Sequence, residues 1–254
     1  MLAEKMIWGV IPDGFKKIED RDGNFLVVRE DRAGQINARI CRDATPDVRY
    51  RGRNSLGTIC LHDGTFALVR NYHHGGLLGR LTRQWFFTWP PRPFRELAIT
   101  EELRRRGLRT VEVYAAGVQR VCGPFYRGCL VTRELRGAKD LWAVLEDEAL
   151  GPGGLSSALR ATAETVRAMH REGVYHADLN LKNILIQPNP GGVEAYVIDL
   201  DKAKLFLGKL PPQLANKNLK RLLRSALKLD PERRFLSAAS WGKFLAFYHG
   251  KTYS

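Results

Sequence analysis

The residues best suited to chemistry in this chain are two acids and an amide in its second half. Asn183 follows Asp178 by five positions, and Asp199 comes directly after the apolar pair Val197 and Ile198. If they converge, three such groups form a site for a nucleotide with its magnesium. One carboxylate accepts the proton of an attacking hydroxyl, and the other two oxygens hold hard cations. The spacing therefore predicts Asp178 as the catalytic base and Asn183 and Asp199 as metal ligands.

Two further polar residues flank these three. His176 opens the motif, and we expect it to make structural hydrogen bonds rather than to transfer protons. Asp201 lies two positions after Asp199, so an extended segment would present both carboxylates on one face. Two roles for Asp201 stay open, because it can assist the metal or pair with a neighbouring lysine.

The elements that must position these residues change type along the chain. Short β-branched or aromatic runs predict strands in the first half, around one helix that Gly107 stops. The strands are expected over residues 25–28, 57–61, 65–72, 111–118 and 125–134, and the helix over 95–106. In the second half, helices are expected over 156–171 and 214–229, with strands at 184–187 and 196–198. The glycine-rich run 151–154 is expected to break the chain before the first of these helices.

This order predicts an α+β, bilobal architecture. The β-rich N-lobe is expected over residues 1–136, with 1–49 poorly assigned, and the helical C-lobe over 137–254. We expect a nucleotide to bind in the cleft between the lobes.

The charge of the chain indicates an anionic partner. Lys and Arg number 41 against 27 acids, a net charge of +14. A phosphate-bearing substrate, anionic lipid or nucleic acid would suit this surface, although a generally basic proteome would also explain it. No RNA-binding module accompanies the charge, so nucleic acid is not expected, and no protein partner is inferred. The four cysteines are expected to be ordinary thiols, and no signal peptide or membrane-spanning run is evident.

Four stretches of the chain resemble the bacterial lipopolysaccharide kinases, a family with a protein-kinase-like fold. They are residues 67–77, 94–97, 176–180 and 218–225. Within that family, these motifs are most similar to those of enzymes that act on 3-deoxy-D-manno-octulosonic acid (Kdo). The resemblance implies ATP- and Mg²⁺-dependent phosphorylation of the 4-hydroxyl of Kdo on a lipid A precursor. It also implies a peripheral position on the cytoplasmic face of the bacterial inner membrane.

The resemblance assigns further residues to nucleotide binding. Arg70 stands where the kinase fold has its phosphate-contacting strand lysine, and Glu96 stands where the partner acid belongs. Glu101 is the alternative partner if the helix phase differs. Gly52 and Gly57 bracket a short run before a strand, which allows a phosphate loop made of backbone amides.

Two basic segments suit an anionic membrane surface or a phosphorylated sugar. The helix over 214–229 carries leucines on one face and cations on the other. Residues 75–91 interleave arginine with aromatic rings, which fits either a membrane interface or packing onto the N-lobe. About fifty residues follow Asp201, too few for a peptide-binding lobe, so a lipid-linked acceptor is favoured. The alternatives are a heptose kinase of the lipopolysaccharide core and an inactive kinase-fold module that binds anionic lipid.

Overall fold

The computed structural model describes residues 11–37, 40, 56–72, 86, 88, 90–123 and 125–251. The chain divides into two compact units. The sheet unit comprises Met6–Glu102 and Val111–Glu134, and the helical unit contains Leu103–Thr110 and Leu135–Ser254. The helical unit thus includes the short stretch Leu103–Thr110 from the first half of the chain.

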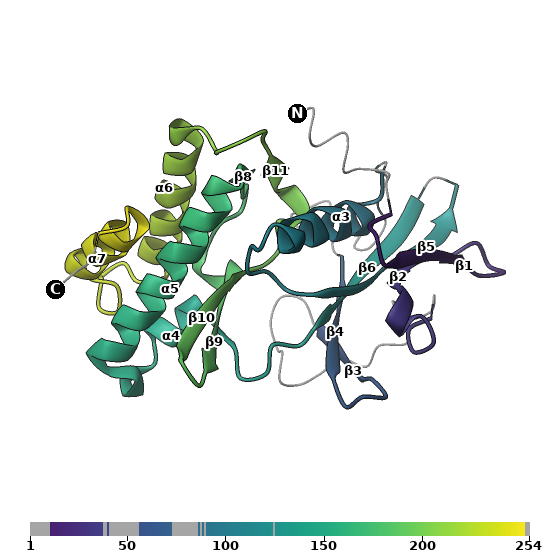
Figure 1. Cartoon of the computed structure of the whole chain (residues 1–254), viewed down its shortest axis with the longest axis horizontal. Helices are drawn as coiled ribbons and strands as arrows, with labels where there is room; N and C mark the ends of the chain where they lie inside the picture. Colours follow the sequence, from purple (N-terminus) through teal and green to yellow (C-terminus); the bar gives the residue numbers. More distant parts are fainter. Residues whose placement is uncertain are drawn as a thin grey trace. The chain divides into compact units, whose positions relative to one another are not determined.

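The sheet unit is built on a six-stranded sheet with strand order β1-β2-β5-β6-β4-β3 (Figure 1). All neighbouring strands run antiparallel. The strands are β1 (Phe15–Glu19), β2 (Phe25–Arg29), β3 (Leu56–Cys60), β4 (Phe66–Asn71), β5 (Val113–Cys122) and β6 (Phe125–Arg133). A short 3-10 turn, η1 (Glu30–Arg32), follows β2.

Alternation along the strands gives the sheet two apolar faces. On β4, Ala67 and Val69 are buried in one cluster of core residues. The odd-and-even pattern of a strand therefore places Leu68 and Arg70 on the opposite face. That face packs against helix α3 (Arg92–Arg105), whose Leu97 lies in the second cluster. Gly107 follows the helix with φ +82°, a conformation that glycine adopts without strain.

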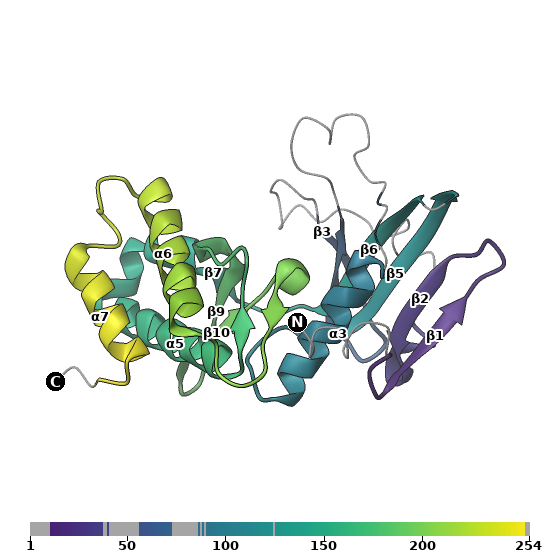
Figure 2. The same ribbon diagram turned by 90° about the horizontal axis from the view of Figure 1, so that it is seen from above.

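The helical unit combines three long helices with short strands (Figure 2). Helix α5 packs against α7 and against strand β10. The helices are α4 (Leu141–Leu145), α5 (Gly151–Arg171), α6 (Pro212–Leu229) and α7 (Ala238–Tyr248). The strands are β7 (Lys139–Asp140), β8 (Val174–Tyr175), β9 (Ile184–Asn189), β10 (Gly192–Val197) and β11 (Lys204–Leu205). The 3-10 turns are η4 (Glu148–Leu150), η5 (Leu181–Asn183) and η6 (Leu200–Lys202).

The fold confirms the predicted α+β class and corrects two local expectations. Helix α5 begins at Gly151, so the run 151–154 is its first turn and not a break. Gly151 has φ +62°, which lets the chain turn from η4 directly into the helix. The expectation of four ordinary thiols also fails, because the buried Cys129 is disulfide-bonded. Cys60 and Cys122 are free and exposed.

Hydropathy along the helices bears on membrane association. Within the described residues, each helix is too short or too polar to cross a bilayer.

Candidate active site

The two segments that carry the predicted acids are tied together by hydrogen bonds. The side-chain amide of Asn183 donates to the carbonyl of Asp178 at 2.9 Å. The backbone N–H of Ile198, at the end of β10, donates to the carbonyl of Asn183 at 3.0 Å. Asp199 is the next residue. The structure therefore brings Asp178, Asn183 and Asp199 together, as the spacing predicted.

His176 also joins the same two segments. Its Nδ1 accepts the backbone N–H of Asp178 at 3.1 Å, so the ring proton lies on Nε2, which contacts the carbonyl of Ile198 at 2.9 Å. The ring is 1% exposed, and this burial lowers its pKa. A neutral imidazole with both nitrogens engaged is a structural residue, in agreement with the role expected for His176.

The side-chain chemistry of Asn183 and Asp199 fits a magnesium ion. The nitrogen of the Asn183 amide is held by the Asp178 carbonyl, which leaves its Oδ1 as the atom to offer a cation. Asp199 has φ +62° and ψ +58°, a left-handed conformation that is uncommon outside glycine and is concentrated at functional sites. Magnesium commonly takes one or two protein oxygens and completes its shell with phosphate and water. Two protein ligands are enough for such an ion.

We expected Asp201 to lie on an extended segment, and it does not. Residues Leu200–Lys202 form the 3-10 turn η6, because Asp199 reverses the backbone immediately before them. The alternation that would align the carboxylates of Asp199 and Asp201 therefore does not apply. The side chain of Asp201 is buried, with the residue 8% exposed.

A network of buried, hydrogen-bonded side chains links the loop to α6 and α7. The sequence analysis did not predict this network. Asn218 is fully buried, donates to the carbonyl of His176 at 2.6 Å and accepts its backbone N–H at 3.2 Å. The Asn218 oxygen also faces Nε2 of His170 at 3.2 Å, and Nδ1 of His170 lies 2.8 Å from the hydroxyl of Tyr248. Ser225, on α6, accepts the backbone N–H of Leu181. In the sequence, the one sign of this network was the polar Asn218 on the otherwise apolar face of its helix.

Because His170 belongs to this hydrogen-bond network, we expect the free energy of unfolding to depend on pH. Burial lowers the pKa of His170 to about 4, against 6.5 for a free histidine. Between these values the unfolded state binds the proton and the folded state does not, so stability falls as pH decreases from 6.5 to 4. The loss attributable to His170 is about 3 kcal/mol. Denaturant unfolding at several pH values should show that the free energy of unfolding falls less between pH 6.5 and 4 for His170→Gln than for the unchanged protein. An equal fall in both proteins would contradict this account. His249→Gln, at an exposed position, is the control.

In the sheet unit, Arg70 and Glu96 form the predicted ion pair. Nη2 of Arg70 lies 2.5 Å from both carboxylate oxygens of Glu96. The Glu96 side chain is only 3% exposed, and the hydroxyl of Tyr72 also donates to it. Glu101 is engaged elsewhere, since its carboxylate accepts the backbone N–H of Val113 at 3.1 Å. The helix phase that selects Glu96 over Glu101 is therefore the observed one.

Loss of the Glu96 charge should destabilise the sheet unit. In Glu96→Gln, Arg70 and Tyr72 would share a neutral amide in place of a buried carboxylate. We expect a loss of about 1–3 kcal/mol in the free energy of unfolding, measured by denaturant titration. Glu101→Gln is the matched control, because glutamine retains the oxygen that accepts from Val113. Equal stability of the two variants would contradict a special role for the Arg70–Glu96 pair.

The remaining predicted positions are partly outside the described residues. Gly57 lies within β3, opposite Val69, and Gly52 lies outside the described part. Most of residues 75–91 also lie outside it. Phe86 is described, 1% exposed, and contacts the ring of Tyr72 edge to face. For Phe86, packing onto the N-lobe is thus the observed arrangement.

Comparisons with known proteins indicate the family of the chain. A model of the lipopolysaccharide kinase (Kdo/WaaP) family matches residues 49–248. A 3-deoxy-D-manno-octulosonic acid kinase of Pasteurella multocida (strain Pm70) is 31% identical, over 73% of this chain and 76% of its own length. A protein of the same name from Stenotrophomonas maltophilia (strain K279a) is 31% identical, over 72% and 71%. A solved structure of WaaP in complex with acyl carrier protein has a TM-score of 0.59 and 24% identity, and 89% of each chain is covered.

Proposed function

The chain belongs to the lipopolysaccharide kinase (Kdo/WaaP) family, and we propose that it transfers the γ-phosphate of ATP to the 4-hydroxyl of Kdo in a lipid A precursor. It is a phosphotransferase with a sugar hydroxyl as acceptor. The observation that carries the proposal is the hydrogen-bonded junction of Asp178, Asn183 and the segment before Asp199. Relatives that share about 31% identity and bear the name of Kdo kinase support the choice of sugar.

Each residue of the junction has a separate task in the proposed reaction. The exposed carboxylate of Asp178 accepts or orients the proton of the sugar hydroxyl as the oxygen attacks phosphorus. Asn183 and Asp199 would hold magnesium through their side-chain oxygens. The bound ion supplies positive charge that offsets the charge developing on the phosphates. His176 keeps the loop in place without changing its charge.

In the sheet unit, Arg70 is proposed to contact the nucleotide phosphates. Its guanidinium is a permanent cation with a forked set of donors, and Glu96 fixes its orientation by taking one nitrogen. A guanidinium offers planar, forked donors of the kind that suit phosphate oxygens. Gly52 and Gly57 are proposed, as before, to flank a phosphate-binding loop.

Mass spectrometry of the product tests the choice of acceptor. Purified protein would be incubated with ATP, magnesium and lipid A precursors that carry either Kdo alone or Kdo extended with heptose. We expect one added phosphate on Kdo, located on the 4-hydroxyl by fragmentation. Phosphate found only on heptose would overturn the Kdo assignment and favour the core heptose kinase. No transfer to either acceptor would favour the inactive module that binds anionic lipid.

The proposed location is the cytoplasmic face of the inner membrane, with peripheral attachment. The net charge of +14 over the whole chain supports it, since cations near an anionic surface contribute about 1 kcal/mol each. The WaaP structure was solved with acyl carrier protein, so the expectation of no protein partner needs its own test. Co-elution of this chain with an acyl carrier protein in gel filtration would contradict that expectation.

A further inference from the structure

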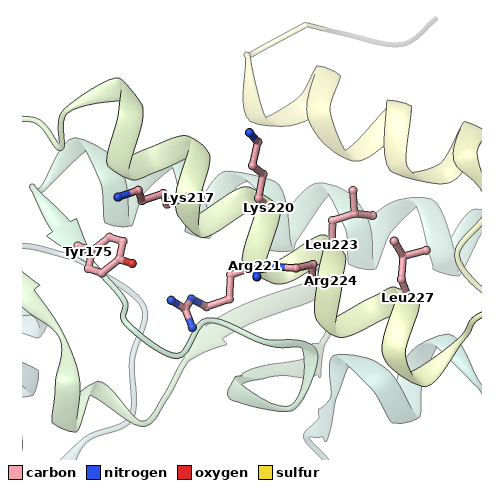
Figure 3. Close-up of a pocket in the computed structure, with 7 residues that line it drawn as sticks. All are labelled: Tyr175, Lys217, Lys220, Arg221, Leu223, Arg224 and Leu227. Carbon is pink, nitrogen blue, oxygen red and sulfur yellow. The ribbon is translucent and has the colours of Figure 1, made fainter.

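Helix α6 lines a pocket with a concentration of positive charge. The pocket has a volume of about 650 Å³, within the range of small-ligand sites. All but one of its lining residues come from α6 (Figure 3): they are Tyr175, Lys217, Lys220, Arg221, Leu223, Arg224 and Leu227. Lys217 and Arg221 extend from the helix toward the side on which Tyr175 lies.

The four cations of this pocket have no anionic partner among the described residues. Other arginines of the described residues are paired with acids, as Arg70 with Glu96 and Arg29 with Glu112, whereas the α6 cations form no such ion pair there. Nε of Arg221 is buried and makes no hydrogen bond within the described part of the chain. A buried donor without an acceptor is unfavourable, and neighbouring like charges repel. An anion in the pocket would relieve the repulsion between the cations.

The other walls of the pocket indicate what the anion is attached to. Leu223 and Leu227 lie one helical turn apart and offer an apolar strip. The ring of Tyr175 provides a flat surface against which a sugar can pack. A concave site with cations, leucines and a ring fits a phosphate on a glycolipid better than it fits a flat lipid surface.

The pocket adjoins the loop that carries the proposed base. Tyr175 precedes Asp178 by three positions, a distance of at most about 10 Å along the chain. Asn218 and Ser225, on the same helix as the cations, bind the backbone of that loop at His176 and Leu181. A ligand held by α6 is thus held by the element that supports the loop.

We propose that this pocket binds a phosphate group carried by the lipid-linked sugar acceptor. Lys220 and Arg224 contact the phosphate, Arg221 adds positive charge to the pocket, and Leu223 and Leu227 contact the apolar part of the lipid. The proposal rests on the proposed function and adds a specificity element to it, because an acceptor without phosphate would lose these contacts.

Kinetics with matched acceptors tests the pocket. The double variant Lys220→Ala/Arg224→Ala changes exposed side chains and should fold normally, and the exposed pair Lys243→Ala/Lys251→Ala is the charge-matched control. In neutral detergent, the double variant should raise the KM for the phosphorylated Kdo-lipid acceptor about tenfold to a hundredfold. The KM for ATP should not change. The KM for the same acceptor after enzymatic removal of its lipid A phosphates should be equal in the variant and the unchanged protein. An unaltered KM for the phosphorylated acceptor, or an equal rise for both acceptors, would overturn the proposal.

Direct binding separates the pocket from the activity. Calorimetric titration with detergent-dispersed diphosphoryl lipid A should show weaker binding by the double variant, whereas fully dephosphorylated lipid A should bind both proteins equally. This comparison stands even if no sugar is phosphorylated, so the two proposals can fail separately. Flotation with phosphatidylglycerol vesicles should be the same for both proteins. If the variant loses vesicle binding but keeps its affinity for diphosphoryl lipid A, the cations serve a membrane surface and the pocket assignment is wrong.

Discussion

Replacement of Asp178 by Asn should lower kcat by about 10²- to 10⁴-fold, the usual contribution of a positioned general base. Asparagine has the same shape as aspartate but cannot take a proton from the attacking hydroxyl. The substitution should leave the loop intact, because the loop is held through the backbone of Asp178. Its N–H is bound by His176 and its carbonyl by Asn183.

The measurement is phosphate transfer to the Kdo-bearing acceptor at saturating ATP and magnesium. A thermal unfolding midpoint equal to that of the unchanged protein would show that the loss is chemical and not structural. Glu232→Gln removes another exposed carboxylate of the helical unit and should retain full activity. Near-normal turnover of Asp178→Asn would remove Asp178 from the role of base.

The second large effect is expected for Asp199→Asn. Asparagine tolerates the left-handed backbone at φ +62°, so the turn into η6 should survive while the charge is lost. A bound cation contributes several kcal/mol to phosphoryl transfer, and about 1.4 kcal/mol corresponds to a factor of ten. We therefore expect kcat to fall about 10²- to 10³-fold.

The magnesium dependence of activity distinguishes a metal ligand from a structural residue. For Asp199→Asn, the magnesium concentration at half-maximal activity should rise well above that of the unchanged protein, while Glu232→Gln should leave it in place. A lower kcat with an unchanged magnesium dependence would argue that Asp199 positions the loop and does not hold the ion.

Local signals predicted much of the fold and of the candidate site. The family resemblance paired Arg70 with Glu96, and strand alternation is consistent with that pairing, because Val69 in the core places Arg70 on the face toward α3. The short-range spacing from Asp178 to Asn183 allows a turn that the side-chain amides of Asn180 and Asn183 close by donating to the Asp178 carbonyl. Both depend on residues close in sequence or on one repeating pattern.

The features that escaped prediction depend on contacts between distant segments. Strands β8 and β11 have two residues each and are defined by each other, with no periodicity to reveal them. Asn218 gains its role only when α6 lies against the loop at His176. Asp199 was expected to continue an extended strand, and its left-handed backbone, which reverses the chain, has no signal in the neighbouring residue types.

The most direct test of the central claim uses ATP radiolabelled on its γ-phosphate with purified protein and a Kdo-bearing lipid A acceptor. We predict that label enters the acceptor in the presence of magnesium, that a chelator abolishes the transfer, and that Asp178→Asn reduces it to a trace. Absence of label in the acceptor with the unchanged protein, or undiminished labelling by Asp178→Asn, would contradict the account.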